Sequence, residues 1–178
     1  MFRNLGARPR TTWIPSFVLK TQAGSLEADL GILWDGGDAS RGPPQLILAE
    51  CKTFGPFKSL DLRRVRALAS FFPGAVMVFA TFRDALESSE RRAIGKLARW
   101  GRKAWRCPVM VLTARELTSD LCPPYCWHHG GSDRERGVYE SVTRAPAPFV
   151  SLRRLADATQ QLYLDMSPDA GWPHYEVP

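Results

Sequence analysis

Two uninterrupted apolar segments, AVMVFAT at residues 75–81 and VMVLT at residues 109–113, constrain the fold of this chain most. Each segment is short and rich in valine, which is typical of a strand buried on both faces. A helical pattern over about residues 84–105 separates them. The order strand, helix, strand predicts a βαβ unit, in which two parallel strands share a sheet.

Periodic apolar positions define the helices on either side of the first segment. From Leu60 to Phe72 apolar residues recur at three- and four-residue steps, which predicts an amphipathic helix that Pro73-Gly74 ends. The helix after the first segment is predicted to begin at the capping pair formed by Asp84 and Glu87.

Three β-prone segments precede this unit, at residues 14–20, 26–35 and 45–52. A loop rich in glycine and proline joins the second to the third, which favours a long hairpin whose strand ends meet in one place. We therefore expect an α/β fold in which a mixed central β-sheet is flanked by helices on both faces.

A chain of 178 residues corresponds to one domain on length alone, and we expect a single domain over 1–178 with its core at about 14–113. Residues 121–148 show no sustained period and are predicted to be irregular. A C-terminal helix is expected over about 151–164, with Ser151 as its N-cap.

Charged residues lie at one end of the apolar part of two of these strands. Side chains alternate along a strand, so Glu27 shares a face with Asp29, and Glu50 shares a face with Lys52, while the Cys51 side chain points away. Charges at the end of an apolar strand are costly to bury unless they are paired or bind a metal. Carboxylates that meet there form the hard oxygen site that Mg²⁺ prefers.

Asp29, followed by Glu50-Cys51-Lys52 in this order of elements, resembles the PD-(D/E)XK nuclease superfamily, also called restriction-endonuclease-like. In this chain Ala28, not proline, precedes the aspartate. The resemblance implies that Asp29 and Glu50 are carboxylate ligands of Mg²⁺ or Mn²⁺, that the main-chain carbonyl of Cys51 is a further ligand, and that Glu27 binds a second ion. It implies that Lys52 orients or helps to deprotonate the attacking water and stabilises the developing charge.

The activity that the resemblance implies is metal-dependent hydrolysis of phosphodiester bonds in DNA by an endonuclease in restriction, defence or DNA processing. Two copies of one site would cut both strands of a duplex, so a homodimer is a reasonable expectation. Targeting or activation by a domain elsewhere is compatible with the small size of the chain. Two alternatives remain: a salt bridge of Lys52 with Glu50 or Asp29 at a solvated strand end, and a non-catalytic DNA-binding or protein-interaction domain that retains the fold.

The charge balance favours a polyanionic partner. Lys and Arg number 24 against 18 Asp and Glu, which gives a net charge of +6. The segment 91–106 contains seven cations and no acid, and the nucleic-acid-binding candidates in it are Arg92, Lys96, Arg99 and Lys103. Cations at the end of a helix that begins with acids also suit its dipole, so a solvated face is the competing interpretation.

A second cluster, CPPYCWHH at residues 122–129, combines sulfur and imidazole groups that suit zinc. Its spacing is not that of a standard zinc finger, and a zinc site at Cys122, Cys126 and His128 is therefore disfavoured against an irregular loop. The histidines are alternatively placed to line a substrate groove.

The composition places the chain among ordinary globular proteins, with 44% apolar and 24% charged residues. No apolar run approaches the roughly 18 residues that a membrane span needs. The first ten residues are cationic, but no apolar segment follows them as in a secretory signal. We therefore expect a cytoplasmic protein with four reduced cysteines and no membrane partner.

Overall fold

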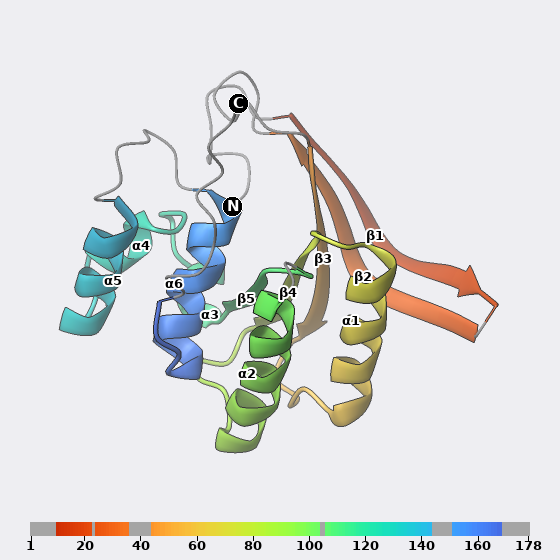
Figure 1. The fold of residues 1–178 in the computed structure, drawn as a ribbon. Coiled ribbons are helices and arrows are strands. Elements are labelled where there is room, and N and C mark those ends of the chain that lie inside the picture. Colours follow the sequence, from red (N-terminus) through yellow and green to blue (C-terminus); the bar gives the residue numbers. More distant parts are fainter. Residues whose placement is uncertain (1–9, 23, 36–43, 104–105, 144–150, 169–178) are drawn as a thin grey trace.

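The computed structural model describes residues 10–22, 24–35, 44–103, 106–143 and 151–168. Its centre is a five-stranded mixed sheet in the order β1-β2-β3-β4-β5, formed by β1 (Arg10–Thr21), β2 (Gly24–Asp35), β3 (Gln45–Lys52), β4 (Val76–Thr81) and β5 (Val109–Leu112). The first three strands are antiparallel neighbours, and β3, β4 and β5 run parallel to one another. The mixed α/β fold predicted from the sequence is confirmed (Figure 1).

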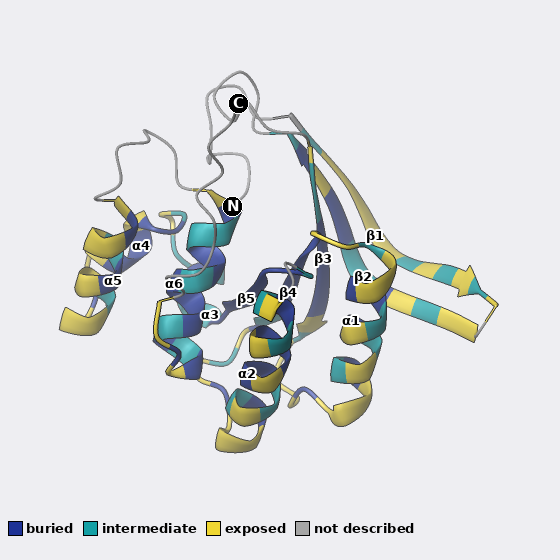
Figure 2. Cartoon of the chain, viewed as in Figure 1, coloured by how far each residue is buried: buried dark blue, intermediate teal, exposed yellow. Residues whose placement is uncertain are grey.

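The helices cover both faces of the sheet. Helices α1 (Ser59–Phe71) and α2 (Ser88–Arg102) connect the parallel strands and bury the apolar residues of one face, including Leu48, Met77 and Val109. On the other face, α6 (Leu152–Leu164) packs over Ile47 and Met110. The sheet thus lies between two helical layers, and its central strands are buried on both sides (Figure 2).

The antiparallel hairpin of β1 and β2 extends beyond the rest of the sheet. These strands pair from Arg10 and Asp35 down to Thr21 and Gly24, whereas β2 and β3 pair only between Leu30–Trp34 and Gln45–Ala49. The tip of the hairpin projects beyond the rest of the sheet (Figure 1), while Ala28 is buried in the core that α1 and α2 cover. The residues of β2 before Leu30 are therefore not paired with β3, and this gap lies beside the carboxyl end of β3.

The helix predicted over 84–105 begins later than expected. Helix α2 starts at Ser88, and the main-chain N–H of its N-cap Glu87 donates to Glu90 Oε2 at 2.7 Å. The prediction that Asp84 and Glu87 open this helix is therefore wrong. The carboxylate that bonds back to the N-cap is that of Glu90, three residues after Glu87. Glu90 is buried by partners outside the helix, and this burial fixes where the helix begins.

The prediction that residues 121–148 are irregular is also wrong for much of the segment. Two helices lie within it, α4 (Tyr125–His128) and α5 (Asp133–Thr143), and α3 (Ala114–Leu117) precedes it. Residues 144–148 of the segment lie outside the described residues. Trp127 is fully buried, and Val138 and Val142, four residues apart, pack into the core that α6 covers. Few apolar positions carry this packing, so the helical period is too weak to read in the sequence.

At the C-terminus, the helix predicted over 151–164 is confirmed as α6. The Ser151 hydroxyl accepts a hydrogen bond from the main-chain N–H of Arg154 at 3.3 Å, as an N-cap does. All four cysteines are free thiols. Among the described residues, none of the helices combines the length and the apolar character that crossing a bilayer requires.

Candidate active site

Asp29, Glu50 and Lys52 come together at the carboxyl end of β3. Glu50 and Lys52 project from the same face of β3, toward α1, because they are two residues apart. Asp29 lies on β2 immediately beyond the last β2–β3 pair, Leu30 with Ala49. Its Oδ2 accepts a hydrogen bond from the main-chain N–H of Cys51 at 2.7 Å. The Asp29 carboxylate thus takes the place of a β2 main-chain carbonyl as the acceptor for the Cys51 N–H.

Glu50 is a buried carboxylate with cationic neighbours. Its side chain is 2% exposed, and its Oε1 lies 2.6 Å from Lys52 Nζ, while its Oε2 lies 3.8 Å from Arg64 Nη1. Burial, together with the charge of Asp29, raises the pKa of Glu50 despite the hydrogen bond from Lys52. Keeping Glu50 ionised therefore costs free energy, and an additional cation beside Glu50 would lower that cost.

Lys52 lies between two carboxylates. In addition to Glu50, its Nζ donates to Asp61 Oδ1 at 3.3 Å, and its side chain is 28% exposed. Partial burial works to lower the pKa of Lys52, but the hydrogen bond to Glu50 and the charges of Glu50 and Asp61 outweigh it and raise the pKa. The ammonium group is consequently protonated at neutral pH.

Helix α1 contributes Asp61, which the sequence analysis missed, and Arg64, which the sequence suggests only as one of several cations of this helix that could contact phosphate. Asp61 is buried in the first turn, where its Oδ2 accepts the main-chain N–H of Lys58 at 2.7 Å. Arg64, one turn later, lies 3.6 Å from Glu27 and 3.8 Å from Glu50. A signal was present, because Asp61 occupies the same helical stripe as the core residue Val65. A charged residue on the apolar stripe of a helix needs a partner, and the sequence does not name it.

The other members of the predicted site differ in their access. Glu27 is 47% exposed on its side chain and pairs with Arg64. The Cys51 side chain is exposed, as the alternation of β3 predicts. The main-chain N–H of Cys51 faces the gap between β2 and β3, where it donates to Asp29, and regular strand geometry predicts that its carbonyl lies on the same side.

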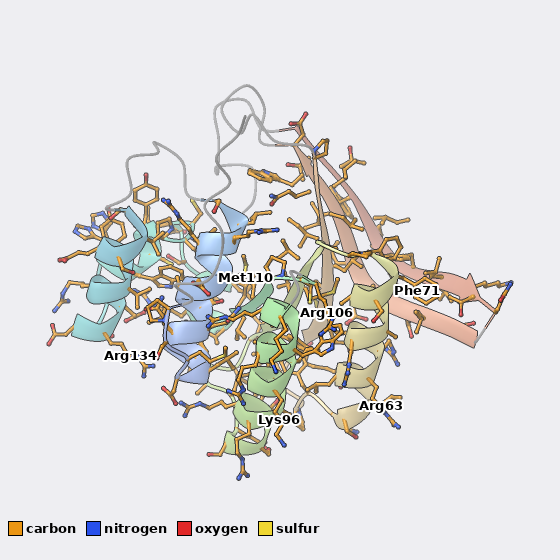
Figure 3. All side chains as sticks on the ribbon, viewed as in Figure 1. Arg63, Phe71, Lys96, Arg106, Met110 and Arg134 are labelled. Carbon is orange, nitrogen blue, oxygen red and sulfur yellow. The ribbon has the colours of Figure 1, made fainter. Side chains whose placement is uncertain are left out.

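The four basic residues predicted to contact nucleic acid are exposed on the outer surface of α2 and at its C-cap: Arg92, Lys96, Arg99 and Lys103. Figure 3 shows Lys96 pointing to solvent from α2. In contrast, Arg91 forms an ion pair with Asp165, and Arg102 pairs with Asp157. The structure does not bring the four exposed cations into the carboxylate cluster, whose polar contacts in the described chain come from β2, β3 and α1.

The segment CPPYCWHH folds around the core. Cys126 is 1% exposed, and burial raises the pKa of its thiol to about 12. His128 is exposed and its ring centroid lies 4.6 Å from that of Tyr139. Across the described part of the chain, no three His, Cys, Asp or Glu side chains form a group that could hold a metal ion. A magnesium site that uses two carboxylates, a main-chain carbonyl and water is a different arrangement.

A second buried carboxylate, Glu116, lies beyond β5. It accepts hydrogen bonds from Trp127 Nε1 at 2.7 Å, from the Thr113 main-chain N–H at 2.9 Å, and from the Tyr163 hydroxyl. With its acceptors occupied by protein donors, Glu116 joins α3, α4 and α6. An open cleft of about 550 Å³ lies beside α3 and is lined by Asp84, Ala114, Arg115, Thr118, Ser119, Glu135 and Tyr163.

The cluster at the end of β3 thus combines carboxylate oxygens with a protonated lysine at the carboxyl end of a central strand. Such a set can bind a hard cation and stabilise negative charge on an oxyanion. In comparisons with known proteins, the chain matches no family model, no curated protein and no solved structure.

Proposed function

We propose that this chain is a divalent-metal-dependent nuclease that hydrolyses phosphodiester bonds in DNA, with Asp29, Glu50 and Lys52 as its active site. The observation that carries the proposal is the burial of Glu50 beside Asp29 and Lys52 at the carboxyl end of a central strand. Titratable groups with a perturbed pKa in such positions are common at functional sites. The antiparallel strands followed by two parallel connections also match the order of elements on which the PD-(D/E)XK resemblance rests.

The donor set fits Mg²⁺ or Mn²⁺. Asp29 and Glu50 would supply two carboxylates, the number that magnesium sites commonly use, and the Cys51 carbonyl would supply a further oxygen. Asp29 Oδ2 is held by the Cys51 N–H, which orients the carboxylate toward β3. When bound there, the cation supplies a water of lowered pKa and neutralises charge on the phosphate.

Lys52 acts as a cation in this proposal. Because the charges of Glu50 and Asp61 keep its ammonium protonated, Lys52 holds the attacking water by donating to it and stabilises the charge that develops on the phosphate oxygens. Asp61 is a positioning residue, since it fixes Lys52 from α1 without lying on the strand itself. Arg64 provides a second positive group beside Glu50.

The second candidate is a non-catalytic DNA-binding or protein-interaction domain. The ion pairs of Glu50 favour this candidate, because Lys52 and Arg64 already neutralise its charge without any added cation. DNA as the partner rests, in both candidates, on the net charge of +6 and on the exposed cations of α2.

A cleavage assay separates the two candidates. Supercoiled, linear and single-stranded DNA are incubated with Mg²⁺, Mn²⁺ or EDTA, and wild type is compared with Asp29→Ala and Lys52→Ala. The exposed residues Asp120 and Lys20 provide matched controls as Asp120→Ala and Lys20→Ala. The proposal expects metal-dependent cutting that falls by about 100-fold or more in the two site variants and is unchanged in the controls.

Binding measurements accompany the assay. Calorimetric titration with Mg²⁺ should show binding to wild type and none to Asp29→Ala, with circular dichroism verifying that the variant folds. Cutting that survives in both site variants would refute the assignment of the site. DNA binding without cutting or metal binding would support the non-catalytic candidate.

A further inference from the structure

Two large aromatic side chains stand exposed beside the proposed active site. Phe54 is 73% exposed and follows Lys52 by two residues, and Phe82 is 50% exposed and follows Thr81, the strand neighbour of Lys52 on β4. The main-chain N–H of Phe82 donates to the Thr53 carbonyl at 3.1 Å. The two loops that carry these rings are therefore joined at the same edge of the sheet.

Both loops are held in place by one buried carboxylate. Glu90 Oε1 accepts the main-chain N–H of Phe57 at 2.6 Å, and the Arg83 guanidinium donates to both oxygens of Glu90 at 2.6 and 2.9 Å. Phe57 is itself buried, with its ring centroid 5.1 Å from that of Phe79 in an edge-on contact. Phe54 and Phe82 thus project from loops that are anchored on both sides.

Single exposed apolar residues are common on protein surfaces. This pair differs because the loops are joined and anchored, and because they follow the two strands at the site. Exposed charges near the two rings in the chain are Lys58, in the same loop as Phe54, Arg63 on α1, and Asp84, two residues after Phe82. Exposed aromatic rings together with cations complement a polyanion with flat apolar groups, and single-stranded nucleic acid has this chemistry.

We infer that Phe54 and Phe82 form a stacking platform for unpaired bases, so that the substrate is DNA with unpaired nucleotides next to the scissile phosphate. The inference rests on the proposed nuclease function and specifies its substrate class. In continuous duplex the flat faces of the bases are covered by neighbouring base pairs. Only an unpaired base can place its face on a phenylalanine while the adjacent phosphate lies at Lys52.

The test uses the full chain carrying Lys52→Ala, which lacks the proposed catalytic cation, so that DNA is bound without being cut. Fluorescence anisotropy measures the affinity for a single-stranded oligonucleotide and for the same sequence as a duplex. Phe54→Ala, Phe82→Ala and the milder Phe54→Leu and Phe82→Leu are compared with Phe71→Ala. Phe71 is 53% exposed at the far end of α1 from Arg63, which makes it a matched control (Figure 3).

The expected result is a loss of single-strand affinity of about fivefold or more for each alanine variant, with duplex affinity and Phe71→Ala unchanged. Photocrosslinking adds a direct readout: single-stranded DNA that contains 5-iodouracil should attach at Phe54 or Phe82 and not at Phe71. Equal losses for single strand and duplex, or effects no larger than those of Phe71→Ala, would overturn the inference.

The two proposals fail in different ways. If wild type cuts duplex DNA with metal while the Phe54 and Phe82 variants bind and cut as wild type does, the platform is refuted and the nuclease stands. If the protein binds no form of DNA, the proposed function fails and the platform with it.

Discussion

The buried carboxylate of Glu90 should be the most sensitive polar position outside the active site. Glu90 is 3% exposed and accepts four hydrogen bonds, from the main-chain N–H groups of Phe57 and Glu87 and from two nitrogens of Arg83, with distances of 2.6 to 2.9 Å. Each of its two oxygens serves one N–H and one guanidinium nitrogen. In Glu90→Gln the amide NH₂ must face one of these donor pairs, whichever way it is oriented.

The expected cost follows from what loses its acceptor. Breaking a buried ion pair by removing one partner costs about 3–5 kcal/mol. The Arg83 side chain is 17% exposed, so water partly screens the charge that is left behind, and the lower end of the range, about 3 kcal/mol, is expected. That is a large part of the roughly 5–15 kcal/mol by which a native domain is stable.

Urea unfolding followed by circular dichroism measures this change in the free energy of unfolding. Asp120→Asn, at an exposed carboxylate outside this network, is the control and should change it by less than about 0.5 kcal/mol. A double variant with Arg83→Gln should lose less than the sum of the two single variants, because the unpaired charge is then removed.

The pH dependence tests the same reasoning. Burial works to raise the pKa of Glu90, but the hydrogen bonds from Arg83 and from the main chain outweigh it and lower the pKa from 4.5. The unfolded chain then takes up the proton first as the pH falls. The advantage of wild type over Glu90→Gln is thus complete at pH 7 and is lost as the pH falls below about 4.5 through the lowered pKa. A cost below about 1 kcal/mol at pH 7, or an advantage that persists in acid, would refute the account.

Three further perturbations probe the site and the core. Arg64→Ala removes a cation that competes with a metal ion for Glu50. Calorimetry should show that the affinity for Mg²⁺ rises about two- to fivefold, while the affinity for DNA falls. An unchanged affinity for Mg²⁺ would contradict this. Glu50→Gln replaces a carboxylate whose pKa is raised by burial with a neutral amide. The free energy of unfolding should therefore stay level or rise by about 1 kcal/mol, and Mg²⁺ binding should be lost. A clear destabilisation in urea would argue against this reasoning. In Gly101→Ala the new Cβ would lie 2.4 Å from the Cys107 carbonyl oxygen, and thermal unfolding should reveal a loss of about 1–3 kcal/mol, whereas an unchanged melting temperature would show that the contact relaxes freely.

Local pattern was sufficient for the sheet and for half of the site. The apolar segments at residues 75–81 and 109–113 can be satisfied only as buried strands, and both appear as β4 and β5. Alternation alone places Glu50 and Lys52 on one face of β3, since successive side chains of a strand point to opposite sides. The period of α6 and its Ser151 cap are likewise local properties, and its bounds followed from them.

Tertiary structure decided what depends on partners far along the chain. Helix α2 begins at Ser88 because Glu90 is drawn inward by Phe57 and Arg83, 33 and 7 residues away, and local capping rules allowed Asp84 and Glu87 equally well. Helix α5 exists because Val138 and Val142 find the core that α6 covers. The contact of Glu90 with Phe57 and the contact of α5 with the core under α6 both join residues that are far apart in the sequence, so local patterns do not reveal them.

The same division holds for the proposed active site. The sequence by itself determined that Glu27 shares a face of β2 with Asp29 and that Glu50 shares a face of β3 with Lys52, because strand alternation is a property of neighbouring residues. Only the packing of α1 against the sheet decided that Asp61 holds Lys52 and that Arg64 faces Glu50. The physical reason is that burial of Glu50 and Asp61 arises from the meeting of separate elements, and charge in a buried site is set by all the groups that surround it.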